Sequence, residues 1–239
     1  MKTQDIEYHA GGERFVGYLA VEEKAGQRPG VLLAPEGPGL GELCKGFARK
    51  LAQLGYVAFA MDYHGDGEVL TDMGEVMGRL GGFMADPDGI RVIAAEALRV
   101  LTAQPETDKG RLAAIGYCFG GTTALELARS GAPLKAVVGF HSGLGAARPA
   151  EPGAVKAVVL TQIGADDPII PPEQRAAFEA EMTKAGADWR MIVYGGAGHS
   201  FTNPDVGAVG RIGFAYNEAA DKRAWRAMLD LFDEVFGPV

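Results

Sequence analysis

The chain alternates short runs of apolar residues with longer segments in which apolar residues recur every three to four positions. The short runs, which predict buried strands, are 30–34, 56–61, 112–116, 136–140, 155–164 and 191–194. The longer segments, which predict helices, are 43–54, 90–102, 122–129, 172–184 and 216–235. Because strands that alternate with helices are typical of βαβ units, we expect an α/β fold with a mainly parallel central sheet flanked by helices.

Two parts of the chain depart from this rhythm. Near the N-terminus, a pair of glycines separates two apolar stretches, 6–9 and 15–20, which predicts an antiparallel hairpin. The stretch 64–85 is rich in Gly, Met and acidic residues and shows no clean period. We expect it to be a cap-like excursion over the sheet edge, acting either as a cap or as a segment that faces substrate. Without an internal repeat or linker, residues 1–239 are expected to form one domain.

Composition narrows the function classes. Lys and Arg total 23 against 31 Asp and Glu, a net charge of −8, and the basic residues are scattered, so nucleic acid is not an expected partner. No apolar run approaches the roughly 20 residues that cross a bilayer, and the first residues lack the apolar core of a signal peptide. We therefore expect a cytoplasmic protein with no membrane partner. The two cysteines are not expected to form a disulfide.

Cys118 is the candidate nucleophile. In Gly116-Tyr-Cys-Phe-Gly120 it follows a predicted strand and precedes a predicted helix, which matches the nucleophile elbow of an α/β-hydrolase with sulfur in place of oxygen. The helix N-terminus favours thiolate over thiol. Cys44 has no glycine elbow around it and is expected to be a packing residue.

A thiol nucleophile needs a proton shuttle and a carboxylate that orients it. His199 follows the last predicted strand in a glycine-rich loop, and Asp167 follows the strand before it, which gives the chain order Cys, Asp, His of this fold. Asp166 is the alternative carboxylate. His64 and His141 also follow strands and are interpreted as packing or substrate-contact residues of the pocket, and His9 as a surface or structural residue.

Two backbone N–H groups are expected to stabilise negative charge on the substrate oxygen. The amide of Phe119 follows the nucleophile directly, and Gly37 lies in the loop after the first buried strand. Glu36 precedes that glycine and is expected to tune the protonation of the thiol, with a solvated loop charge as the alternative. No metal site is expected, since no cluster of histidines or cysteines has the spacing of metal ligands.

The motifs are Gly-Tyr-Cys-Phe-Gly-Gly at 116–121, Gly-x-x-Asp at 164–167, Ala-Gly-His-Ser-Phe at 197–201, and Glu36 after the first buried strand. In this order, and over nearly the whole chain, the sequence resembles the dienelactone hydrolase family. The resemblance implies a triad of Cys118, Asp167 and His199, a Glu36 that holds the resting thiol until substrate displaces it, and no cofactor.

One departure from the family bears on the substrate. Family members that act on carboxylate-bearing lactones place an arginine four residues after the histidine, where this chain has Asn203. Arg79, in the cap-like stretch, is the candidate for the family's other substrate arginine. The chain is also similar to metagenome-derived family members that hydrolyse aryl esters and phosphotriesters.

The leading hypothesis is hydrolysis of a small-molecule lactone or activated ester through a thioester on Cys118, with a neutral ester as the favoured substrate. The alternative is hydrolysis of a phosphotriester by the same residues. A binding protein on a retired hydrolase fold and a thiol redox sensor are the hypotheses from other classes. The sequence leaves a homodimer open.

Overall fold

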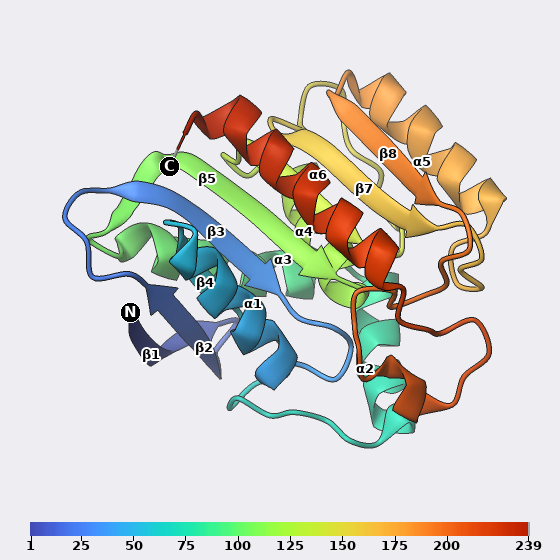
Figure 1. Ribbon diagram of the computed structural model, residues 1–239, viewed down its shortest axis with the longest axis horizontal. Coiled ribbons are helices and arrows are strands. Elements are labelled where there is room, and N and C mark those ends of the chain that lie inside the picture. Colours follow the sequence, from blue (N-terminus) through green and yellow to red (C-terminus); the bar gives the residue numbers. More distant parts are fainter. Residues whose placement is uncertain (239) are drawn as a thin grey trace.

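The computed structural model describes residues 1–238, which form an eight-stranded sheet with helices on both faces (Figure 1). The strands are β1 (Lys2–Ala10), β2 (Glu13–Val21), β3 (Arg28–Ala34), β4 (Val57–Ala60), β5 (Thr107–Tyr117), β6 (Ala136–Phe140), β7 (Val158–Gly164) and β8 (Trp189–Tyr194). The helices are α1 (Glu42–Gln53), α2 (Met73–Ala85), α3 (Asp88–Ala103), α4 (Phe119–Arg129), α5 (Pro172–Ala185), the short 3₁₀ helix η1 (Val206–Val209) and α6 (Glu218–Phe236).

The strand order is β1-β2-β4-β3-β5-β6-β7-β8. β1 and β2 form the predicted antiparallel hairpin, β2 pairs antiparallel with β4, and the pairs from β4 to β8 are parallel. The prediction of an α/β-hydrolase fold with a mainly parallel sheet is therefore confirmed. Since the parallel strands end at one edge, the loops after β3, β5, β7 and β8 meet there.

Two apolar cores lie on the two faces of the sheet. Helices α1 and α6 cover one face, where α6 contributes Ala224, Met228 and Phe232, all fully buried (Figure 1). Helices α3, α4 and α5 pack on the other face, where α5 contributes Phe178 and Met182. Because helices cover both faces of the sheet, the central strands are apolar at successive positions rather than at alternate ones.

The stretch 64–85 is more ordered than its sequence suggested. Its second half forms the 13-residue helix α2, and the side chain of Asp72 caps it by accepting the Glu75 N–H at 2.8 Å. The conclusion that this stretch has no clean period was wrong. Met73, Val76, Met77 and Leu80 recur at the spacing of one helix face, and the four glycines between Gly74 and Gly82 obscured that spacing.

Candidate active site

The turn between β5 and α4 presents Cys118 at the carboxyl edge of the sheet. Its backbone has φ 54° and ψ −119°, a sparsely populated conformation for a residue other than glycine. A Cβ on Gly116 would lie 2.0 Å from the carbonyl oxygen of Gly120, and a Cβ on Gly120 would lie 2.0 Å from that of Ala34. The sharp turn therefore requires glycine on both sides of the cysteine.

The imidazole of His199 lies between a thiol and a carboxylate. Its Nε2 is 3.2 Å from Sγ of Cys118, and its Nδ1 is 2.8 Å from Oδ2 of Asp167. The other oxygen of Asp167 accepts the backbone N–H of Ile169 at 2.8 Å, and the His199 N–H donates to the Gly213 carbonyl at 2.7 Å. Backbone contacts thus hold both the aspartate and the histidine in place.

Hydrogen bonds, acting against burial, set the charge of His199. The side chains of His199 and Asp167 are 1% and 0% exposed. Burial alone disfavours a charged imidazole, but the hydrogen bonds from His199 to Asp167 and Cys118 outweigh it and raise the pKa of His199 to about 10. Asp166, the alternative carboxylate, is exposed. Asp167 is therefore the aspartate that contacts the imidazole.

His141 lies beneath the site and joins two of its loops. The backbone N–H of Cys118 is shared between the Phe140 carbonyl at 2.9 Å and Nδ1 of His141 at 3.1 Å. Because an N–H can only donate, Nδ1 is the acceptor, and Nε2 carries the proton that it donates to Oγ1 of Thr202 at 2.8 Å. Burial, reinforced by nearby His199, lowers the pKa of His141 well below its usual value. His141 is therefore a neutral bridge rather than a wall of the pocket.

The two amides predicted to stabilise an oxyanion lie at the carboxyl edge of the sheet. The N–H of Phe119 lies at the first residue of α4, and that of Gly37 lies in the loop after β3. Within residues 1–238, neither of them donates to another backbone group. A helix N-terminus carries partial positive charge, so the Phe119 amide is well suited to negative charge on a ligand.

The side chain of Glu36 contacts Asn203. Its Oε2 accepts from Nδ2 of Asn203 at 2.9 Å. Burial raises the pKa of Glu36, and the hydrogen bond from Asn203 opposes that rise. Among the described residues, Sγ of Cys118 has His199 as its hydrogen-bond partner, not Glu36. The tuning of the thiol by Glu36 therefore stays a prediction.

Cys118 and His199 line a cavity of about 180 Å³, which we call the thiol cavity. Its apolar wall consists of Met73, Val76, Met77, Leu80, Ile169, Val206 and Phe214. Asn203 and Arg211 are among its polar residues, and the Arg211 guanidinium lies 4.6 Å from the centroid of the Phe214 ring. The apolar wall from α2 was not among the residues predicted for the pocket, although the helical spacing of Met73 and Met77 was a usable signal.

Two residues expected in the substrate pocket lie elsewhere. His64 donates from Nε2 to the Gly37 carbonyl at 2.8 Å, so it supports the loop rather than a ligand. Arg79 is bound by Glu68 at 3.0 Å and Glu75 at 2.7 Å. His64 and Arg79 line a polar hollow that is separate from the thiol cavity. Arg79 lies on the polar face of α2, whereas the apolar face of that helix lines the thiol cavity.

Cys44 and His9 both lie outside the hydrogen-bonded chain of Cys118, His199 and Asp167. Cys44 is buried in α1, where burial raises the pKa of its thiol, as a packing residue requires. His9 is exposed. Across the described chain, no group of three or more His, Cys, Asp and Glu side chains is arranged to hold a metal ion. No helix in residues 1–238 combines the length and apolar character needed to cross a bilayer.

A cysteine on a strand-to-helix turn, hydrogen-bonded to a histidine and through it to an aspartate at the carboxyl edge of a mainly parallel sheet, gives the architecture of an α/β-hydrolase. The family model described as "Dienelactone hydrolase family" matches residues 15–236. The chain therefore belongs to the dienelactone hydrolase family and is a hydrolase.

Individual relatives agree with this assignment. A solved structure named m3DLH is 47% identical, with a TM-score of 0.96 over 98% of each chain. A dienelactone hydrolase-like promiscuous phosphotriesterase, P91, from metagenomic libraries is 43% identical, with a TM-score of 0.95 over 99% of each chain. A probable 2-oxo-3-(5-oxofuran-2-ylidene)propanoate lactonase from Bradyrhizobium sp. is 28% identical over 94% of this chain and 91% of its own length.

Proposed function

We propose that this protein hydrolyses a neutral lactone or activated carboxylic ester through a thioester on Cys118. The observation that carries the proposal is the continuous hydrogen-bonded chain from Cys118 through His199 to Asp167, with its thiol end open to an apolar cavity. Most of that cavity wall is apolar, the buried carboxyl of Glu36 is already hydrogen-bonded to Asn203, and the guanidinium of Arg211 lies over the Phe214 ring. An uncharged ester fits these surroundings best.

Acylation proceeds from the thiolate of Cys118 and the imidazolium of His199, the pair that forms when the thiol proton passes to Nε2. The thiolate attacks the carbonyl carbon, and the N–H groups of Phe119 and Gly37 stabilise the oxyanion that forms. The carbon–oxygen bond to the leaving group then breaks, and His199 returns its proton to the departing oxygen. Asp167 stabilises the imidazolium throughout and keeps its ring oriented.

Deacylation reverses the proton movements. His199 takes a proton from a water molecule, whose oxygen attacks the thioester carbon. The bond from carbon to Sγ of Cys118 breaks, the acid product leaves, and the proton on His199 restores the thiol. The raised pKa of His199 suits a group that must hold a proton between the two halves of the reaction.

A burst experiment tests the proposal. Stopped-flow hydrolysis of 4-nitrophenyl acetate at high enzyme concentration should release nitrophenol in a burst equal to the active-site concentration, followed by slower turnover. Cys118→Ala should show no burst and Cys44→Ala should retain it. If Cys118→Ala kept the burst, the thioester mechanism would be wrong.

The second candidate is hydrolysis of a phosphotriester by the same residues. It is favoured by the similarity to the phosphotriesterase P91, which is 43% identical over 99% of this chain. The thiolate would attack phosphorus, the bond from phosphorus to the aryloxy oxygen would break with a proton from His199, and the same amides would hold the phosphoryl oxygen. His199 would then activate a water molecule that attacks phosphorus, breaks the bond to Sγ and releases the phosphodiester. Comparing kcat/KM for 4-nitrophenyl acetate and diethyl 4-nitrophenyl phosphate decides between the candidates, because the two substrates share one leaving group.

A further inference from the structure

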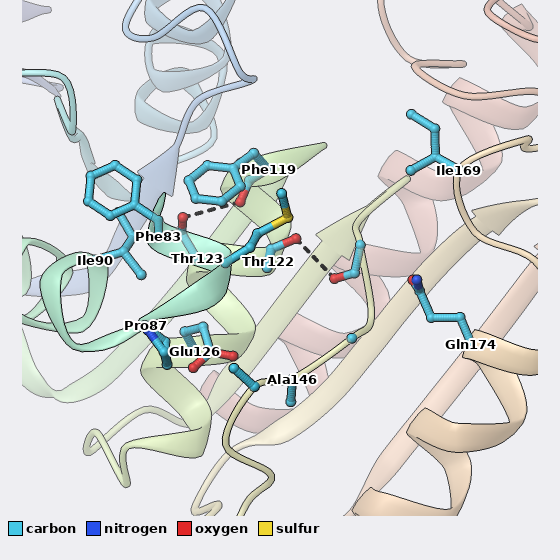
Figure 2. Close-up of a pocket in the computed structure, with 14 residues that line it drawn as sticks. Phe83, Pro87, Ile90, Phe119, Thr122, Thr123, Glu126, Ala146, Ile169 and Gln174 are labelled. Atoms are coloured by element: carbon cyan, nitrogen blue, oxygen red, sulfur yellow. Dashed lines mark hydrogen bonds between the residues drawn. The ribbon is translucent and has the colours of Figure 1, made fainter. Parts of the chain in front are cut away.

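A second cavity lies beside helix α4 and is larger than the thiol cavity. It has a volume of about 320 Å³ against about 180 Å³, and we call it the α4 cavity. In Figure 2, Phe119 and Ile169 lie toward one end of it, and Ala146 lies toward the other. Nothing in the proposed chemistry uses this space.

The α4 cavity adjoins the thiol cavity. Ile169 lines both of them. Helix α2 also contributes to both, with Met77 and Leu80 in the thiol cavity and Phe83 and Met84 in the α4 cavity. Phe119, which follows the nucleophile directly, forms part of the α4 cavity wall. The two cavities are therefore neighbours that share a wall, and Phe119 places the α4 cavity one residue from the nucleophile.

The lining of the α4 cavity offers no free charge. Its charged residue is Glu126, whose two carboxylate oxygens are bound by Nε of Arg91 at 2.8 Å and Nη1 of Arg129 at 2.9 Å. The hydroxyl protons of Thr122 and Thr123 are donated to backbone carbonyls (Figure 2). Since burying an uncompensated polar group is costly, an uncharged hydrocarbon group fits this space best.

The position of His199 decides which part of a substrate enters each cavity. To protonate the leaving oxygen, His199 must lie on the leaving-group side of the tetrahedral carbon. His199 lines the thiol cavity and is not part of the α4 cavity wall. The leaving group therefore belongs in the thiol cavity, and the acyl substituent extends past Phe119 and Ile169 to the other side.

We propose that the α4 cavity is the acyl subsite and that it binds an uncharged alkyl or aryl group several carbons long. This inference rests on the thioester mechanism proposed above and adds a substrate class to it. It identifies Ala146, at the far end of the cavity in Figure 2, as a residue that limits acyl length without touching the reacting atoms.

The test varies acyl length with the leaving group held constant. For 4-nitrophenyl acetate, butyrate and hexanoate, kcat/KM of the wild type should rise by up to about fourfold for each added methylene, as burial of a methylene predicts. Ala146→Trp should reduce kcat/KM for the hexanoate by at least about tenfold and change that for the acetate less than about twofold. Ala146→Leu, which adds less volume, should give an intermediate loss.

The matched control is Ala103→Trp, which places the same indole at an exposed position at the end of α3. It should leave kcat/KM for both esters within about twofold of the wild type. A flat dependence on acyl length in the wild type, or equal losses for acetate and hexanoate in Ala146→Trp, would overturn the acyl subsite. Neither result would affect the burst on Cys118, so this inference can fail while the proposed function stands.

Discussion

Replacing Asp167 by asparagine should disable His199 while preserving the shape of the site. The rise in the pKa of His199 from 6.5 to about 10 corresponds to about 5 kcal/mol in favour of the imidazolium, at about 1.36 kcal/mol for each unit. The hydrogen bond from Asp167 is the largest contribution to that rise, since burial acts against it. Loss of half to all of this preference predicts a fall in kcat/KM of about 10²- to 10⁴-fold.

The same substitution should change the pH profile. The imidazolium of His199 persists below its pKa and is lost above it, so kcat/KM of the wild type for an ester with an alkoxide leaving group should fall as pH rises through about 10. In Asp167→Asn, this falling limb should move to lower pH. Initial rates at low substrate concentration from pH 5 to 10.5, with circular dichroism to establish folding, measure both effects.

Asp166→Asn is the matched control, since it makes the same change at the exposed neighbouring position. It should leave both kcat/KM and the pH profile close to those of the wild type. If Asp167→Asn kept kcat/KM within threefold of the wild type with the limb still near pH 10, Asp167 would not support the imidazole. If kcat/KM fell in Asp166→Asn instead, Asp166 would be the aspartate that supports the imidazole.

Two further substitutions test residues that support the site, Gly120 in the turn at the nucleophile and Asn203 beside Glu36. Gly120→Ala puts a Cβ 2.0 Å from the Ala34 carbonyl oxygen. It should lower the free energy of unfolding in urea by about 3 kcal/mol and abolish ester turnover. The control Gly78→Ala, where a Cβ meets open space on α2, should raise the free energy of unfolding by about 0.5–1 kcal/mol. Equal stabilities of the two variants would contradict the packing argument. Asn203→Leu removes a donor from Glu36 and should cost about 1–3 kcal/mol at pH 8. A carboxyl whose pKa is raised in the folded state stabilises the fold below its ordinary pKa of 4.5 and loses that contribution as pH rises through the raised pKa, so the stability lost in Asn203→Leu should be smaller near pH 4.5 than at pH 8. A loss of stability that does not change with pH, or one that Glu36→Gln fails to restore when added to Asn203→Leu, would refute this account.

The sequence predicted the sheet, its helices and the residues of the hydrogen-bonded chain because these depend on local signals. A glycine elbow, apolar runs and loops that follow strands are all readable along the chain. Cys118, Asp167 and His199 come together because each lies just after a parallel strand, and such strands end at the same edge. Their assignment as catalytic residues stays a prediction, as do the single domain and the cytoplasmic location.

The parts that sequence analysis missed depend on which way side chains point. His141 was interpreted as a packing or pocket residue, but its role as a neutral acceptor depends on a hydrogen bond to the Cys118 backbone that no pattern encodes. Arg79 lies in the expected cap-like stretch, yet it projects from the polar face of α2 toward Glu68 and Glu75. Which side chains Arg79 meets depends on how α2 is rotated about its axis, and the glycines in that stretch hid the helical spacing that would have indicated the rotation.

Helix α2 lines both cavities but contributes no residue to the hydrogen-bonded chain of Cys118, His199 and Asp167. The hydrogen-bonded chain and the two amides come from loops anchored in the sheet, whereas one 13-residue helix contributes walls to both cavities. Its methionines at 73, 77 and 84 are about half exposed, so exchanging them disturbs little of the core. Changes confined to this one helix could therefore redirect the enzyme to new substrates in nature or in the laboratory while the reacting groups stay in place.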